Sequence, residues 1–303
     1  MIDIHAHFAY RDFFPDFYLT GIAEDILDRL PDDVKETTGI DYFKKVVLNN
    51  VNDRDCKKLF TQMEKAGIKQ TVLLIIDFFF NTTDHPLALE EIYKAHYHIA
   101  READGKLIIF TGIDPRRGEV GLTLLKKSIE EYGFRGLKLY PPSGFELTDH
   151  QLFPFYELCR DYQIPVLSHI GPTIKSMNHD STFPRSIENF AENFPTLSFI
   201  LGHGGILFFD ESLQLMKKYK NIYADISGFQ LVFHEKEMVI NKVKTLLKEV
   251  PEQILFGTDW PLYNLKGSQK KWVDYFMGSE ELSKDDVNRL MSFNAKKLLG
   301  IND

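Results

Sequence analysis

Residues 2–7 read Ile-Asp-Ile-His-Ala-His, and the fold prediction starts from this stretch. Polar and apolar residues alternate in it, which is typical of a β-strand whose successive side chains point to opposite faces. The alternation predicts that Asp3, His5 and His7 share one face of the strand. Two imidazoles spaced in this way can reach one metal ion, because zinc and similar ions bind neutral histidine nitrogen.

Short apolar runs recur along the rest of the chain, with helical segments between them. This alternation is typical of βαβ units and a parallel sheet. The predicted strands are Ile2–His7, Thr71–Ile76, Leu107–Gly112, Gly136–Tyr140, Pro165–His169, Ser198–Gly202, Ile222–Asp225 and Gln253–Gly257. The predicted helices span residues 53–66, 86–102, 119–132, 149–161, 184–193, 211–219, 235–249 and 284–299.

Polar residues at the strand ends distinguish a closed barrel from an open doubly wound sheet. His169 ends the fifth predicted strand, His203 follows the sixth and Asp259 follows the eighth. A lone histidine at such a position can be an ordinary core residue. Several metal-binding side chains at the same end of different strands instead favour a (β/α)8 TIM barrel, where these ends converge on one axis.

A long segment at residues 8–51 interrupts the repeat after the first strand. It is rich in aromatic residues and much longer than an ordinary loop between a strand and a helix. We predict one barrel domain over residues 1–303 that carries this segment as an insertion. The insertion is interpreted as a helical hairpin packed by its aromatic side chains or as a lid over the barrel mouth, and the two interpretations are compatible.

Composition excludes several classes of protein. The formal net charge is −8, from 36 Lys and Arg against 44 Asp and Glu, and no long basic run indicates a nucleic-acid partner. The longest apolar run, residues 72–80, contains Asp77 and is too short to span a membrane. Cys56 and Cys159 are too few for a disulfide framework, and no signal-peptide pattern opens the sequence. We therefore expect a soluble, cytoplasmic protein.

The motifs together resemble those of the amidohydrolase superfamily. Within it, the chain is similar to the amidohydrolase-related branch that includes aminocarboxymuconate semialdehyde decarboxylase, and the resemblance extends over essentially the whole chain. The motifs that carry it are Asp3-x-His5-x-His7, Gly136-Leu-Lys-Leu-Tyr-Pro-Pro142, His169, Leu201-Gly-His-Gly-Gly205, Gly257-Thr-Asp-Trp-Pro261 and Asn294-Ala-Lys-Lys-Leu-Leu-Gly300.

The resemblance implies a set of site residues. His5, His7, His169 and Asp259 become metal ligands, with Asp259 also catalytic, and His203 becomes a further ligand or, by preference, the acid/base residue. A metal ion lowers the pKa of bound water, and a nearby carboxylate or imidazole can accept its proton. We expect one divalent ion, zinc.

Three cationic residues are candidate substrate contacts. Lys138 lies on the fourth predicted strand, where it either lines the pocket or, if carboxylated, bridges a second metal ion. Arg116 and Arg185 follow strands at positions from which a guanidinium can bind a substrate carboxylate, although solvated loop arginines are more common. His179 is the only histidine of a loop or helix that we expect to approach the site, and the others are expected at the surface.

These residues predict an enzyme of the metal-dependent hydrolase type that activates water to cleave a C–O or C–N bond in a small molecule. The alternative is a nonoxidative decarboxylase, a lyase acting on a small unsaturated or aromatic carboxylate. Hydration of a double bond and lactone opening are further options, since fold and metal do not decide among chemistries built on one scaffold. A non-catalytic metal-binding barrel is the alternative from another class. A homo-oligomer is compatible with the sequence.

Overall fold

The computed structural model describes residues 1–83, 85–233, 235–262 and 267–302, and it contains an eight-stranded parallel sheet. The strands pair in the order β1 to β8, each with its neighbour along the chain. They are β1 Ile2–Ala6, β2 Gln70–Leu74, β3 Leu107–Gly112, β4 Leu137–Leu139, β5 Val166–His169, β6 Phe199–Gly202, β7 Ile222–Asp225 and β8 Ile254–Leu255. All eight predicted strands are confirmed, and their ends differ from the prediction by two residues at most.

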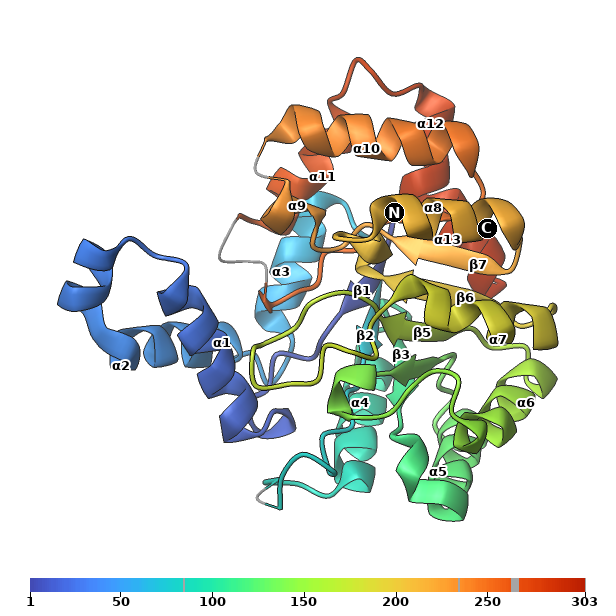
Figure 1. Ribbon diagram of the computed structural model, residues 1–303, viewed down its shortest axis with the longest axis horizontal. Coiled ribbons are helices and arrows are strands. Elements are labelled where there is room, and N and C mark those ends of the chain that lie inside the picture. The colour runs from blue at the N-terminus through green and yellow to red at the C-terminus, as the bar shows by residue number, and fades with distance from the viewer. Residues whose placement is uncertain (84, 234, 263–266, 303) are drawn as a thin grey trace.

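Backbone contacts between β1 and the segment that contains β8 close the sheet into a barrel. Ile4 N donates to Phe256 O at 2.9 Å, and Asp259 N donates to His5 O at 2.7 Å. Ala6 forms a parallel bridge with Trp260. The α/β fold is therefore the predicted (β/α)8 TIM barrel, and helices surround the strands in Figure 1.

Helices follow the strands and cover the outside of the barrel (Figure 1). They are α3 Lys57–Ala66, α4 Leu89–Glu102, α5 Gly118–Glu130, α6 Phe153–Asp161, α7 Glu188–Asn193, α8 Phe209–Lys218, α9 Phe229–Val232, α10 Lys236–Glu249, α11 Gln269–Met277, α12 Lys284–Asn288 and α13 Asn294–Leu299. The sequence did not predict α9 or α11. The predicted helix 284–299 is divided by a π-helical turn at Arg289–Phe293.

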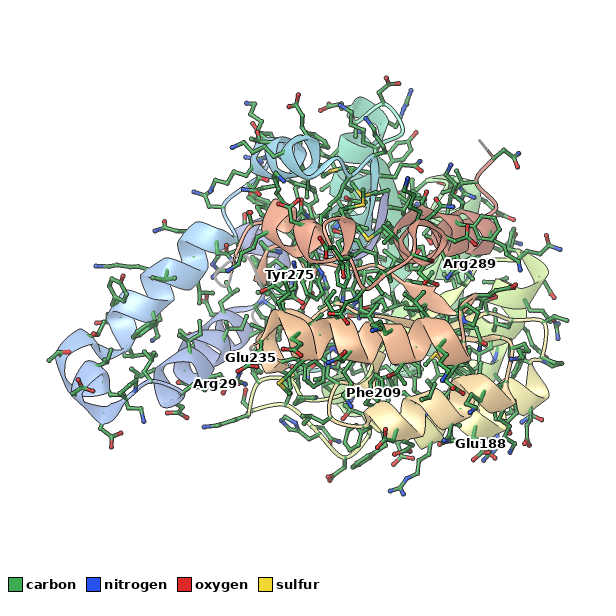
Figure 2. All side chains as sticks on the ribbon, turned by 90° about the horizontal axis from the view of Figure 1, so that it is seen from above. Arg29, Glu188, Phe209, Glu235, Tyr275 and Arg289 are labelled. Atoms are coloured by element: carbon green, nitrogen blue, oxygen red, sulfur yellow. The ribbon has the colours of Figure 1, made fainter. Side chains whose placement is uncertain are left out.

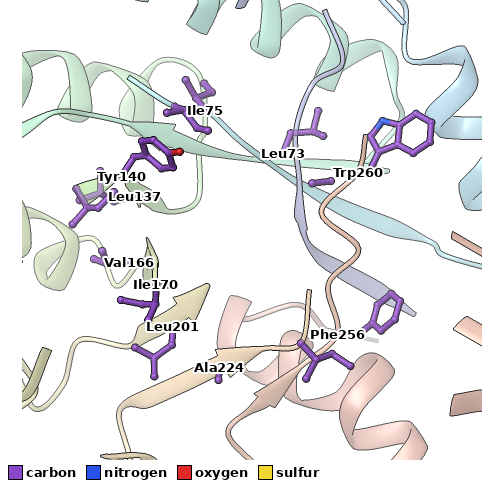
Figure 3. Packing of buried hydrophobic residues seen from close by; sticks show 14 of the residues in the cluster. Leu73, Ile75, Leu137, Tyr140, Val166, Ile170, Leu201, Ala224, Phe256 and Trp260 are labelled. Carbon is purple, nitrogen blue, oxygen red and sulfur yellow. The ribbon is translucent and has the colours of Figure 1, made fainter. Parts of the chain in front are cut away.

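Two apolar layers hold the barrel together. The smaller cluster combines alternate strand residues such as Val72, Ile108 and Leu167 with Ala295 and Leu299 from the region of α13, and it fills the barrel interior. The larger cluster lies between strands and helices. Figure 3 shows members of this outer cluster, labelled on several strands around the barrel. Strands covered on both faces explain the nearly continuous apolar runs of the sequence.

The first strand contains a β-bulge that the sequence did not predict. Asp3 pairs with Thr71 and Ala6 with Leu73, so β1 has one residue more than β2 over this stretch. Ile2 and Ile4 pack in the interior cluster. Strict alternation predicted that Asp3 shares a face with His5 and His7. This prediction is wrong, because Asp3 lies on the face opposite to Ile2 and Ile4. The extra residue turns His5 back toward the interior, where it binds Asp225.

The insertion at residues 8–51 contains α1 Asp16–Asp28 and α2 Asp32–Asn50, which pack against each other as a helical hairpin. Figures 1 and 2 both show the hairpin extending to one side of the barrel. Its first turn reaches the mouth, since the ring of Tyr18 lies 4.7 Å from that of Phe78. Phe8, Phe13 and Phe14 are buried in the outer cluster.

Candidate metal centre

His5 and His7 come from the end of β1, and both are buried. His5 Nδ1 lies 2.8 Å from an oxygen of Asp225, and His7 Nδ1 lies 2.9 Å from the carbonyl oxygen of Leu74. Carboxylate and carbonyl oxygens are acceptors, so Nδ1 carries the proton in both rings. The Nε2 atom of each ring therefore presents a lone pair.

His169 and His203 approach from the ends of β5 and β6. His169 Nε2 lies 3.3 Å from the carbonyl oxygen of Pro172, and His203 Nδ1 lies 2.9 Å from Ser227 Oγ. His203 Nε2 and His169 Nδ1 are 3.2 Å apart. His203 adopts a positive φ of 65° and is followed by Gly204 at 55°, so the chain makes a tight turn here that glycine accommodates without strain.

Asp259 follows β8 and lies opposite the histidines of β1. Its φ of 54° is in the left-handed region, and its backbone nitrogen is fixed by His5 O. Asp259 Oδ1 lies 3.2 Å from His7 Nε2 and 3.6 Å from His5 Nε2. Burial alone would raise the pKa of this carboxyl, but the imidazoles of His7, His5 and His203 hold the pKa well below its usual range.

The orientation of the four rings fits a bound cation. Each outer nitrogen has an acceptor, so the inner nitrogens of His5, His7, His169 and His203 face the centre as acceptors beside the Asp259 carboxylate. His5 Nε2 and Asp259 Oδ1 are buried without a hydrogen-bond partner among the described residues. Such an acceptor-only set is costly to bury unless a cation binds it.

Among the described residues, His5, His203 and Asp259 form a group that could hold a metal ion, because one ligand atom of each lies within 4.8 Å of the others. His7 and His169 flank this group on either side. Burial is the main cause that lowers the histidine pKa values, to about 4 for His203 and well below the usual value for His169. The rings of His169 and His203 are therefore neutral near pH 7, which is the form that binds a metal ion.

Lys138 adds a positive charge to this site. It lies on β4 between the outer-cluster residues Leu137 and Leu139, so its side chain faces the interior. The side chain is 1% exposed. Burial lowers the pKa of its ammonium to about 8, although Asp259 and Asp225 act in the opposite direction.

The two candidate arginines have partners outside this cluster. The Arg116 guanidinium binds Asp114, with Nε at 2.8 Å from Oδ1, and it also donates to Ser143 O. Arg185 is exposed, with its guanidinium 5.2 Å from the Phe183 ring centre.

The remaining histidines divide between loops, surface and core. His179 contacts the carbonyl oxygen of Ile174 within its own loop. His98 and His150 are exposed as expected, His85 stacks on Phe79, and His234 lies outside the described residues. The expected surface position of His96 is wrong, because α4 buries this ring beside Phe8 and Phe13.

Sequence reasoning missed two polar residues of the site. Asp225 ends β7 and is fully buried, where it binds His5 through one oxygen and Ser227 through the other. The strand-end rule that identified His169 applies equally to Asp225, so this signal was present. Ser227 lies two residues beyond the strand and contacts His203, a relationship that depends on the folded turn.

Aromatic side chains border the cluster on the side of β4. The ring of Tyr140 lies 5.1 Å from that of His169, and its hydroxyl contacts Thr173 Oγ1 at 2.6 Å. Phe78 and Tyr18 pack next to Tyr140. Tyr140 thus places an aromatic ring beside the candidate ligand His169, with Phe78 and Tyr18 behind it.

Fold and cluster together define a TIM barrel with a candidate divalent metal site at the C-terminal ends of its strands. The chain belongs to the amidohydrolase family, whose sequence profile matches residues 2–301. The family resemblance expected from the sequence is confirmed. Among the described residues, no helix is long and apolar enough to cross a membrane.

By sequence, the chain is similar to a hydratase. The chain is 30% identical over 145 residues to 2-keto-4-carboxy-3-hexenedioate hydratase from Sphingobium sp.. This match covers 40% of the chain and only 42% of the hydratase.

Solved structures of two decarboxylases share the fold. The 2,6-dihydroxybenzoate decarboxylase from Rhizobium has a TM-score of 0.69 and 15% identity, covering 100% of this chain and 99% of that one. The 5-carboxyvanillate decarboxylase from Novosphingobium aromaticivorans, solved with manganese and a nitrobenzoic acid, has a TM-score of 0.68 and 14% identity, covering 99% and 96%. At these identities the likeness concerns the fold alone.

Proposed function

We propose that this protein is a metal-dependent lyase that decarboxylates a small unsaturated or aromatic carboxylate. The observation that carries the proposal is the convergence of the four histidine nitrogens and the Asp259 carboxylate beside the buried cation of Lys138. The decarboxylases of similar fold favour this reaction over hydrolysis, which was the first expectation from the sequence.

The proposed division of roles keeps His5, His7, His169 and Asp259 as metal ligands and His203 as the acid/base residue. A bound divalent ion would polarise substrate oxygens and stabilise negative charge. His7 and His169 donate their outer N–H groups to neutral carbonyl oxygens, as metal-binding rings commonly do. His203 is instead linked through Ser227 to the Asp225 carboxylate, which stabilises a proton on the ring.

Lys138 is the proposed contact for the substrate carboxylate, because its ammonium lies inside the barrel and the Arg116 guanidinium is bound to Asp114. His203 Nε2 first gains a proton from solvent and donates it to the substrate carbon that bears the carboxylate, where π electrons of the unsaturated or aromatic substrate form the new C–H bond. The carbon–carbon bond then breaks, its electron pair restores the conjugated system, and CO2 leaves. Tyr140, beside His169, offers a flat apolar wall for such a planar substrate.

A hydratase is the second candidate, and the hydratase from Sphingobium favours it. In this reaction His203 accepts a proton from water as its oxygen adds to one alkene carbon, and the other carbon gains a proton. The same residues therefore serve both reactions. The metal is a divalent ion in either case, with zinc the sequence-based expectation and manganese the ion in one decarboxylase of similar fold.

A product-resolved assay tests the proposal. The protein is stripped with chelator and reloaded with Mn²⁺ or Zn²⁺, then incubated with 2,6-dihydroxybenzoate, 5-carboxyvanillate and 2-keto-4-carboxy-3-hexenedioate. CO2 release and loss of alkene absorbance are followed separately. We expect metal-dependent CO2 release from at least one carboxylate. Alkene hydration without CO2 would establish the hydratase instead, and metal binding without turnover of any substrate, amides and lactones included, would indicate a non-catalytic barrel.

A further inference from the structure

Ser227 lies between the Asp225 carboxylate and the ring of His203. Its Oγ contacts Asp225 Oδ1, His203 Nδ1 at 2.9 Å and His5 Nδ1 at 3.2 Å. The Asp225 carboxylate acts as an acceptor, because Oδ1 receives the backbone N–H groups of His203 and Ser227 and Oδ2 receives His5 Nδ1. The hydroxyl of Ser227 therefore finds an acceptor in this carboxylate.

These contacts fix the direction of the hydrogen bonds. Ser227 has one hydroxyl proton, and it donates this proton to Asp225. His203 Nδ1 must therefore donate to Ser227 Oγ, which makes Nδ1 the protonated nitrogen and leaves Nε2 to face the metal centre. Because His5 Nδ1 donates to the other oxygen of Asp225 at 2.8 Å, one carboxylate orients both rings.

The backbone holds Ser227 in this position. Its amide nitrogen donates to Asp225 Oδ1 at 3.0 Å, and the amide nitrogen of His203 donates to the same oxygen at 3.2 Å. Ser227 is fully buried. Gly257 packs against Ser227, and a Cβ added to this glycine would lie only 3.1 Å from Ser227 Cβ. The absence of a side chain at Gly257 therefore provides the space that Ser227 occupies.

We propose that Ser227 is a positioning residue whose hydroxyl links Asp225 to His203 and holds Nε2 as the atom that exchanges protons with the substrate. The inference rests on the proposed role of His203 as acid/base. When Nε2 accepts a proton, Nδ1 keeps its own proton and its bond to Ser227, and the positive charge of the ring faces Asp225 through one hydroxyl. Ser227 and His203 Nδ1 both keep their protons in this step.

Ser227→Ala tests the inference, with Ser128→Ala as the matched control because Ser128 is also fully buried and also binds a hydroxyl, that of Thr111. Nitrogen-15 NMR of Zn²⁺-loaded protein reports the protonated nitrogen of His203. We expect Ser227→Ala to lose the single Nδ1-protonated form and to lower kcat roughly 10- to 100-fold with little change in KM. Calorimetry should show that metal affinity is nearly unchanged.

Asp225→Asn is the comparison that separates the two roles of the carboxylate. This variant also disturbs His5 and should weaken metal binding roughly 10- to 100-fold. If Ser227→Ala leaves the His203 tautomer unchanged, or lowers metal affinity alone, Ser227 does not position His203 as proposed. Failure of the proposed function gives a different result, because the wild-type protein would then show no lyase turnover. The NMR comparison of the His203 ring would still decide the role of Ser227.

Discussion

His203 Nε2 and His169 Nδ1 face each other across 3.2 Å, while the other nitrogen of each ring is bonded elsewhere. Two neutral acceptor lone pairs repel each other, so a cation stabilises this arrangement. We predict that removing metal with a chelator lowers Tm and that Mn²⁺ or Zn²⁺ restores it. Free metal at a concentration of 100 times its Kd should add about 2.7 kcal/mol to the free energy of unfolding. Identical melting curves with and without metal would contradict this prediction.

Replacing Asp259 by Asn should reduce kcat/KM by roughly 10²- to 10⁴-fold, because the side chain loses the charge that faces His5 and His7. Asn tolerates the left-handed backbone found at this position, with φ of 54°, so the fold should persist. Circular dichroism checks the fold and steady-state kinetics check activity. Undiminished turnover in a folded variant would disprove the role of Asp259.

Asp3 holds the bulged strand β1 against the Asp259 turn. Its carboxylate accepts from Thr258 N at 3.0 Å, from Thr258 Oγ1 at 2.6 Å and from His5 N at 3.2 Å. We predict that Asp3→Asn lowers the free energy of unfolding by about 1–3 kcal/mol, because an amide group would face donors that need an acceptor. It should also weaken metal binding in calorimetry.

The control for this change is Asp53→Asn. Asp53 is likewise a buried carboxylate that accepts backbone N–H groups, those of Lys58 and Leu59, at the start of α3. It should lose stability while keeping its metal affinity. Equal losses of metal affinity in the Asp3 and Asp53 variants would show that the Asp3 effect is not specific to the site.

Lys138 should give the stability of metal-free protein a distinctive pH dependence. Its pKa is lowered from 10.5 to about 8 on folding, so the unfolded chain binds more protons between these values. Stability of the wild type relative to Lys138→Met should therefore rise as the pH increases from about 8 to 10.5, by up to about 3 kcal/mol. Urea unfolding at several pH values measures this difference.

The exposed Lys65→Met variant is the charge-matched control for that series. If the stability difference between wild type and Lys138→Met stayed constant from pH 7 to 10, Lys138 would not be a buried, destabilised ammonium. A mass increase from carboxylation in the wild type would also show that Lys138 is not an ammonium. It would favour the alternative in which the carboxylated lysine bridges two metal ions.

The sequence was sufficient to predict the barrel because each of its strands is a short apolar run, and these runs differ from the helices in both length and pattern. It could not reveal the bulge in β1. Perfect alternation of residues 2–7 predicts one polar face, whereas pairing with β2 and the bonds from Thr258 place the side chains of Asp3 and His5 on opposite faces of the strand. Register depends on the partner strand, which local alternation does not describe.

The candidate site was predictable where a polar residue of the site ends an apolar strand, as His169 and Asp225 do, although only His169 was identified. Ser227 was not predictable, because its contact with His203 joins two loops that meet only in the folded barrel. His96 is a residue for which the sequence was misleading. A polar residue in a predicted helix is expected to be exposed, but packing against Phe8 and Phe13 from the insertion buries this ring.

Anomalous diffraction from crystals soaked in Mn²⁺ locates the metal ion and identifies its ligands. We expect one strong peak at the C-terminal ends of the strands, bound by His5, His7, His169 and Asp259, with nitrogen and oxygen distances of roughly 2.0–2.3 Å. His203 Nε2 should lie outside bonding distance of the ion. The absence of a peak at saturating Mn²⁺, or an ion bound by His203 and not by His169, would disprove the proposed metal centre.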